Sequence, residues 1–267
     1  CLLDSAFPDD ELEKQRALQL AAIRREWERP MTHAHQMVRE TFFPGHPYRY
    51  SPLGETGTVA TLTREAVQAH HRKLIGASNL VLAVFGDVRA AAVRELAETH
   101  FSALTANNAP TWPPLPSAPT EPVRLEKRLP FKQTVLVRAW PGIAIGDPRE
   151  DAISVLMDAL SGLSSELFIS VRDQRGLAYY TGATQFSGPV GGLFIIYSGT
   201  TAEGLPEVEA QIDVQAARLA RDGTEPDEFA RAIEQLLAEQ ARAWQNNAGL
   251  AQQCALDELL GLGWRHA

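Results

Sequence analysis

An arginine and a tyrosine seven positions apart are the side chains of this sequence best suited to chemistry. Arg172 lies near the end of a predicted helix, Gly176 follows at a predicted turn, and Tyr179 begins a predicted strand. Glycine suits that turn because it readily adopts the left-handed conformation that ends many helices. A guanidinium and a phenol both donate hydrogen bonds, so together they suit a carbonyl oxygen that gains negative charge. We therefore expect Arg172 and Tyr179 to reach one point.

The same two residues also have a purely structural explanation. An arginine late in a helix interacts favourably with the helix dipole. A tyrosine at the start of a strand is common because aromatic side chains fit a half-buried pleated surface. Spacing alone favours this structural explanation, so the argument for chemistry depends on the residues around the pair.

Those surrounding residues resemble a motif of the pitrilysin/insulinase (M16) zinc metallopeptidase family. The motif is a small residue and Ser-Ser-x-Leu-Phe, then Arg, then Gly-Leu-Ala-Tyr, and the stretch 163–179 matches it almost residue for residue. Two further stretches are similar to family patterns, the His-Pro-Tyr loop at 43–54 and the Asn-to-Gly-Asp run at 79–88. The resemblance implies that Arg172 and Tyr179 bind the substrate carbonyl near the scissile bond, across a closed chamber from the zinc.

The family's catalytic signature is missing. That signature is an inverted His-x-x-Glu-His on a helix, in which two histidines bind zinc and the glutamate activates water. No two of the seven histidines are four positions apart: His33, His35, His46, His70, His71, His100 and His266. By alignment with the family, Ala22 occupies the position of the third zinc ligand, a glutamate, and Gln15 stands where a second acid is often found. The chain is therefore expected to hold no cofactor, and the zinc is expected in a partner half.

Composition excludes several other classes of protein. The formal net charge of −8 argues against nucleic-acid binding, which requires a basic face. No apolar run is long enough to predict a membrane span. The content of 45% hydrophobic and 22% charged residues is that of a soluble globular protein, periplasmic or cytoplasmic if bacterial. The acidic side chains of the predicted helices 204–221 and 226–245 are expected to be solvated.

A proline-rich stretch divides the chain. Six prolines fall between residues 105 and 122, so we predict an extended linker at 106–122. Helix and strand patterns recur on both sides, and strands are predicted at 79–85, 123–129 and 134–140, with a hairpin at 177–198. The predicted fold is α+β, the M16 metallopeptidase-like (LuxS/mitochondrial-processing-peptidase-like) fold, with mixed sheets flanked by helices and a duplicated domain. Measured against that family, residues 1–105 are the C-terminal part of one domain and 123–267 most of a second that lacks its C-terminal end.

The resemblance and the missing ligands together predict a non-catalytic half of an M16-type zinc-dependent peptidase. Such a half closes the chamber and binds an unfolded peptide for a zinc-bearing half or subunit. Uncovered sheet edges in a fragment of this kind also predict a homo-oligomer. One alternative is a catalytically silent structural or assembly subunit of the same fold. Another is an independent metalloenzyme using His33, His35 or His70, although their spacing does not favour a metal site.

Overall fold

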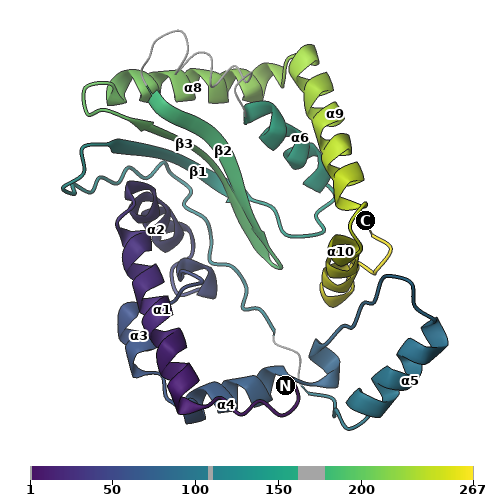
Figure 1. Cartoon of the computed structure of the whole chain (residues 1–267). Coiled ribbons are helices and arrows are strands. Elements are labelled where there is room, and N and C mark those ends of the chain that lie inside the picture. The colour runs from purple at the N-terminus through teal and green to yellow at the C-terminus, as the bar shows by residue number, and fades with distance from the viewer. Residues whose placement is uncertain (1, 108–110, 162–177, 267) are drawn as a thin grey trace. The chain divides into compact units, whose positions relative to one another are not determined.

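The structure is a computed structural model that describes residues 2–107, 111–161 and 178–266 (Figure 1). The chain forms two compact units that alternate along the sequence. The first unit comprises Cys1–Ala21, Thr56–Trp112 and Glu239–Ala267, and the second comprises Ala22–Glu55 and Pro113–Ala238. The predicted domains, 1–105 and 123–267, follow the duplicated domain of the family, whereas these units are defined by compactness alone. The predicted domain boundaries therefore stay a prediction.

The second unit is built on a three-stranded antiparallel sheet in the order β1-β3-β2. The strands are β1 (Thr134–Gly142), β2 (Ala178–Gly188) and β3 (Gly191–Thr200). The predicted hairpin is confirmed, because a tight turn connects β2 to the antiparallel β3, and Gly188 pairs with Gly191 at this turn. Gly191 has a φ of 146°, a conformation that favours glycine.

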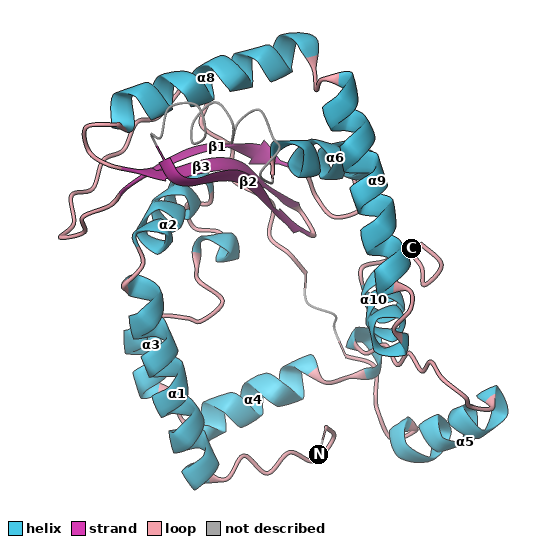
Figure 2. Cartoon of the chain, turned by 45° about the horizontal axis from the view of Figure 1, so that its top comes forward, coloured by secondary structure: helices cyan, strands magenta, loops and turns pink. Residues whose placement is uncertain are grey.

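Helices cover one face of this sheet. They are α6 (Glu150–Leu160) and α8 (Leu205–Asp222), as Figure 2 shows. Val208 and Ile212 of α8 are fully buried against Ile196 of β3 and Ala183 of β2. Val208 and Ile212 are four positions apart, so they lie on one face of α8, and that face packs on the sheet.

The opposite face of the sheet is covered by α2 (Pro30–Phe42) and by the loop that follows it. Phe43 and Tyr48 are buried there against Leu193 and Ile195 of β3. A short 3-10 helix, Pro47–Arg49, carries Tyr48 into this cluster. The His-Pro-Tyr loop is therefore part of the core of the second unit.

The first unit is mostly helical. It contains α3 (Thr56–Thr61), α4 (Arg64–Leu74), α5 (Ala90–Phe101) and α10 (Asn247–Leu259), while α1 (Asp9–Trp27) and α9 (Pro226–Ala243) contribute to both units. Arg16 of α1 donates to the carbonyl oxygens of Val59 and Leu62, at 2.7 and 2.6 Å, and so fixes α3 against α1. None of the described helices is both long and apolar enough to cross a membrane.

Two predicted strands are wrong. The runs 79–85 and 123–129 form no strand with any described residue, and several of their apolar side chains are exposed, among them Leu82 at 54% and Val123 at 55%. A strand requires a hydrogen-bonded neighbour, so an apolar run with β propensity stays outside a sheet when no neighbour is present. The predicted α+β fold class is confirmed, and the described sheet is antiparallel throughout.

Candidate functional site

Tyr179 lies at an irregularity at the beginning of β2. Ala178 pairs with Thr200 of β3, but Tyr180 pairs with Gly199, so Tyr179 is an extra residue that has no partner in β3. A bulge of this kind redirects a side chain relative to the regular alternation of the strand. The side chain of Tyr179 is 60% exposed. The structure thus presents a phenol to solvent at one end of an edge strand.

The residues after the bulge hold the strand in place. The Ser198 hydroxyl donates to the Tyr180 carbonyl oxygen at 3.2 Å, and the Thr181 hydroxyl donates to the Tyr197 carbonyl oxygen at 3.1 Å. The Tyr180 ring lies directly over Gly199, where a Cβ atom would come within 2.4 Å of Tyr180 Cζ. Glycine is required there because of this close approach. The Tyr180 ring therefore packs against β3, while the Tyr179 side chain faces solvent.

The side chain of Tyr180 is partly buried, whereas that of Tyr179 is exposed. Burial raises the pKa of Tyr180, and the nearby Tyr197 raises it further. The two rings lie 6.2 Å apart, and the Tyr180 hydroxyl lies 3.5 Å from Gln133 Oε1. This phenol stays protonated at neutral pH, and its ring lies beside that of Tyr197.

Arg172 and the predicted turn at Gly176 lie outside the described residues. The meeting of Arg172 and Tyr179 at one point therefore stays a prediction. Of the predicted pair, the structure gives the position of Tyr179 alone.

The residue predicted to stand at the third zinc-ligand position, Ala22, does not suit zinc. Ala22 is half-buried in α1 beside the fully buried Ile23, and Gln15 of the same helix is exposed. A methyl group has no lone pair to give to a metal. Within residues 2–107, 111–161 and 178–266, no three His, Cys, Asp or Glu side chains gather closely enough to hold a metal ion.

Comparison with known proteins identifies the family of this chain. The family model of the Peptidase M16 inactive domain matches residues 61–236. The chain belongs to this family. It is 26% identical over 233 residues to the uncharacterized zinc protease YmxG of Bacillus subtilis, covering 87% of this chain and 56% of that protein. It is 28% identical over 267 residues to an uncharacterized zinc protease of Streptomyces coelicolor, covering 97% of this chain and 58% of that protein.

Solved structures share the fold of this M16 inactive domain. A peptidase M16 inactive domain from Pseudomonas fluorescens superimposes with a TM-score of 0.83 at 24% identity, covering 98% of this chain and 62% of that one. A protease from Helicobacter pylori gives a TM-score of 0.81 at 19% identity, covering 96% and 63%. The chain thus spans little more than half the length of these relatives.

Two histidines of this M16 inactive domain, His33 and His35, lie on α2. The centre of the His33 ring lies 4.8 Å from that of Trp27 and 5.8 Å from that of Phe131, with the rings tilted, and His33 Nε2 lies 2.9 Å from the Trp27 carbonyl oxygen. His35 is half-buried, and burial lowers its pKa, with a further lowering by the nearby Arg39. A neutral ring suits such a site, and neither histidine belongs to a cluster of metal-binding side chains among the described residues.

His46 is a packing residue of the loop that follows α2. His46 is 3% exposed and its Nδ1 accepts a hydrogen bond from the Tyr48 backbone N–H at 3.1 Å. Because Nδ1 accepts, the proton of a neutral ring lies on Nε2, which donates to the Pro113 carbonyl oxygen at 3.1 Å. Leu115 also packs into the cluster of Phe43 and Leu193. Part of the predicted linker is therefore fixed onto the second unit rather than free.

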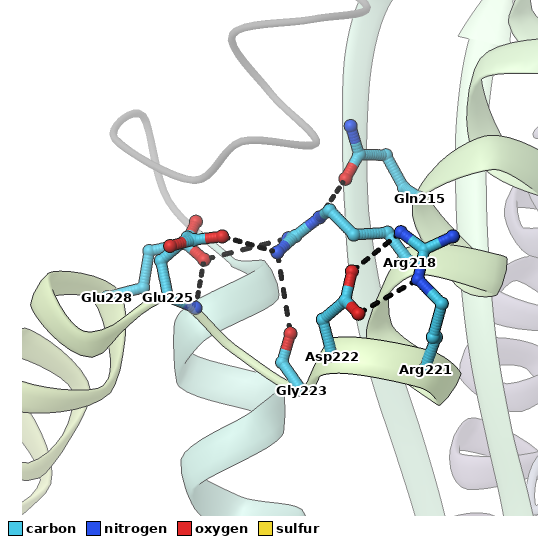
Figure 3. Close-up of polar contacts among 7 residues, drawn as sticks. All are labelled: Gln215, Arg218, Arg221, Asp222, Gly223, Glu225 and Glu228. Carbon is cyan, nitrogen blue, oxygen red and sulfur yellow. Dashed lines mark hydrogen bonds and ion pairs between the residues drawn. The ribbon is translucent and has the colours of Figure 1, made fainter.

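The expected solvation of the acidic residues on α8 and α9 is wrong at Glu228, which is 7% exposed. Figure 3 shows Arg218 between this residue and Gln215. Arg218 pairs with Glu228 at 3.8 Å and with Glu225 at 3.4 Å, and it donates to Gln215 Oε1 at 3.0 Å. The Glu228 carboxylate also accepts the Glu225 backbone N–H at 3.4 Å. A glutamate three residues after a helix cap is a sequence signal for this arrangement.

Proposed function

We propose that this chain is the non-catalytic half of an M16-type zinc-dependent peptidase. In this role it closes the chamber and binds an unfolded peptide substrate for a zinc-bearing half or subunit, which supplies the metal and the general base. Tyr179, with Arg172, donates hydrogen bonds to the substrate carbonyl group near the scissile bond.

The exposed phenol of Tyr179 carries the proposal. The family motif Gly-Leu-Ala-Tyr is complete in this sequence, and its tyrosine is 60% exposed on a bulge at the start of an edge strand. Burial of an aromatic ring is the usual outcome of folding, so an exposed ring that is fixed by a bulge suits contact with another molecule. A subunit used only for assembly has no need of such a group.

The absence of zinc ligands supports the non-catalytic part of the proposal. Ala22 replaces the glutamate of the family, and the histidines are occupied in packing at His33 and His46. The curated relatives carry the name zinc protease, and this chain covers 56% and 58% of their lengths. Chemistry in this scheme therefore requires a second polypeptide region that holds the metal.

The test combines this chain with the zinc-bearing half, taken from the same or a neighbouring gene, and measures hydrolysis of an unfolded peptide. Tyr179→Phe removes one hydrogen-bond donor and keeps the ring. Loss of a donor to a developing oxyanion typically lowers the rate by about 10²–10³. We expect this loss in kcat for Tyr179→Phe and for Arg172→Ala, with the zinc content unchanged.

A matched control is Tyr50→Phe, because Tyr50 is also exposed, at 51%, but lies in the loop after α2. This variant should retain the wild-type rate. Wild-type turnover of Tyr179→Phe, in protein with a normal unfolding transition, would refute the role of Tyr179 and favour the structural or assembly subunit instead.

A further inference from the structure

Two matching tripeptides face each other directly after the bulge at Tyr179. They are Tyr180-Thr181-Gly182 of β2 and Tyr197-Ser198-Gly199 of β3. In the antiparallel register of the two strands, the pairs are Tyr180 with Gly199, Thr181 with Ser198, and Gly182 with Tyr197. Each tyrosine therefore lies opposite a glycine, and the two hydroxyl-bearing residues lie opposite each other. We refer to this arrangement as the paired tripeptides.

The hydrogen bonds between the paired tripeptides are reciprocal. The Ser198 hydroxyl of β3 donates to the Tyr180 carbonyl oxygen of β2 at 3.2 Å. The Thr181 hydroxyl of β2 donates to the Tyr197 carbonyl oxygen of β3 at 3.1 Å. Ser198 is fully buried, so water does not compete for its hydrogen bond. Each strand thus holds the backbone of the other.

The aromatic rings of the paired tripeptides are reciprocal as well. The Tyr180 ring covers Gly199, where any Cβ atom would overlap it, and a Cβ atom at Gly182 would lie 3.0 Å from the Tyr197 hydroxyl oxygen. Gln133, just before β1, adds to the cover, because its Nε2 would lie 2.8 Å from a Cβ atom at Gly199. A ring that covers a glycine of the neighbouring strand favours one register over its alternatives.

The place of the bulge depends on this register. Ala178 and Ala183 of β2 both pack in the buried cluster around Ile196, although five positions separate them. In a regular strand an odd separation would put these two alanines on opposite faces of the sheet. Between Ala178 and the paired tripeptides one residue is left without a partner in β3, and this residue is Tyr179. A different register would reverse the faces of the side chains and move the bulge.

We propose that the paired tripeptides position Tyr179 for the reaction, an inference that rests on the proposed function of this tyrosine. Ser198 and Gly199 are neighbours in β3, so they act on Tyr180 from opposite faces of the sheet. The residue directly after Tyr179 is therefore fixed both at its carbonyl group and at its ring. The bulge is thereby held in one place, and the phenol with it. This hold matters because a catalytic group misplaced by about 1 Å can lose about 10²-fold in rate.

The test uses this chain combined with the zinc-bearing half and measures hydrolysis of an unfolded peptide. Ser198→Ala and Thr181→Val each remove one hydroxyl without adding bulk. We expect each substitution to lower kcat by about 10–100-fold. The KM and the zinc content should change little, since the interaction with Tyr179 is made in the transition state.

A double variant separates positioning from a general loss of structure. If Ser198 acts through the Tyr179 hydroxyl, Ser198→Ala should have no further effect once Tyr179→Phe has removed that hydroxyl. The double variant should therefore be no slower than Tyr179→Phe alone. A general structural defect would instead slow the wild type and the Tyr179→Phe variant by the same factor.

The matched control is Ser187→Ala, the same substitution at the other end of the hairpin, where Ser187 pairs with Gly192. This variant should keep the wild-type kcat. Hydrogen exchange gives a second measurement: the amides of 180–182 should exchange faster in Ser198→Ala and in Thr181→Val than in the wild type. In Ser187→Ala they should exchange at the wild-type rate. The two hydroxyl variants are independent, so one decides the question if the other fails to fold.

The outcomes distinguish this inference from the proposed function. A slow Tyr179→Phe beside Ser198→Ala and Thr181→Val variants of wild-type rate would overturn the positioning role and leave the proposed function standing. Equal slowing by Ser198→Ala with and without Tyr179→Phe would overturn the positioning role too, as would unchanged exchange of 180–182 in both hydroxyl variants. Wild-type turnover of Tyr179→Phe would refute the proposed function itself, and the positioning role with it.

Discussion

The hydroxyl oxygen of Tyr48 accepts a hydrogen bond from the backbone N–H of Val190, 3.3 Å away, across 142 positions of sequence. This contact ties the His-Pro-Tyr loop to the turn between β2 and β3. The Tyr48 ring also meets Phe43 at 5.4 Å and Phe186 at 5.0 Å. A Cβ atom at Gly188 would lie 2.3 Å from the Tyr48 hydroxyl, so the turn closely fits this side chain.

Tyr48→Phe should lower the free energy of unfolding of the second unit by about 1 kcal/mol, because a hydrogen bond to a backbone N–H is lost. Tyr48→Ala should cost about 3–5 kcal/mol, because it also leaves a cavity among aromatic rings. Urea unfolding followed by tryptophan fluorescence measures both values. Tyr50→Phe serves as the control and should change little, since Tyr50 is 51% exposed. Equal effects of the Tyr48→Phe and Tyr50→Phe substitutions would contradict the importance of the contact with Val190.

Glu228→Ala should destabilise the turn between α8 and α9. The substitution removes the buried partner of Arg218 and frees the backbone N–H of Glu225. Leaving buried polar groups without their partner costs about 1–3 kcal/mol, more for a charged group. The loss is measurable by urea unfolding. Glu234→Ala, at an exposed position of the same helix, should change stability by less than about 0.5 kcal/mol. A Glu228→Ala variant as stable as Glu234→Ala would show that the ion pair contributes nothing.

Asp147 should titrate well below an ordinary aspartate. The Arg149 side chain donates to its carboxylate at 2.8 Å, the Arg149 backbone N–H donates at 2.9 Å, and these bonds lower the pKa of Asp147 from 3.8 to about 2. A lowered pKa in the folded state stabilises the fold above about pH 4, and this contribution is lost as the pH falls towards 2. Titration of the carboxyl carbon by NMR measures the value directly.

The matched variants for this titration are Arg149→Ala and Arg128→Ala. The first should return the pKa of Asp147 towards 3.8, because both side-chain bonds to the carboxylate are removed. The second removes an exposed arginine that pairs with Glu126, so it should leave Asp147 unchanged. An Asp147 that titrates near 3.8 in the wild type would contradict the pairing.

The isolated chain should bind no stoichiometric zinc and cleave no unfolded peptide. Ala22 gives no ligand, and no two histidines have the spacing of the catalytic helix. Atomic absorption on protein purified without chelator, together with a fluorogenic peptide assay, tests this expectation. Ala22→Glu is the informative variant: one carboxylate without a histidine pair should still recruit no zinc. One tightly held zinc ion per wild-type chain would overturn the expectation.

Local sequence signals predicted the helices 204–221 and 226–245 and the hairpin at 177–198. The two helices are observed as α8 and α9. The turn at Gly188-Pro189 separated β2 from β3 because glycine and proline interrupt strands. These features depend on residues close together in the sequence, which is why composition and spacing revealed them.

Sequence also determined the family and the absence of the catalytic signature, because both depend on residue identity alone. It could not determine that runs 79–85 and 123–129 would stay outside a sheet. Strand formation requires a hydrogen-bonded neighbour, and apolar content such as that of Leu82 or Val123 says nothing about whether one is present. The tertiary structure decided this, as it decided the burial of Glu228 against Arg218 and the contact of Tyr48 with Val190. It also decided that Tyr179 faces outward, because the bulge depends on the register of β2 against β3 and not on either strand alone.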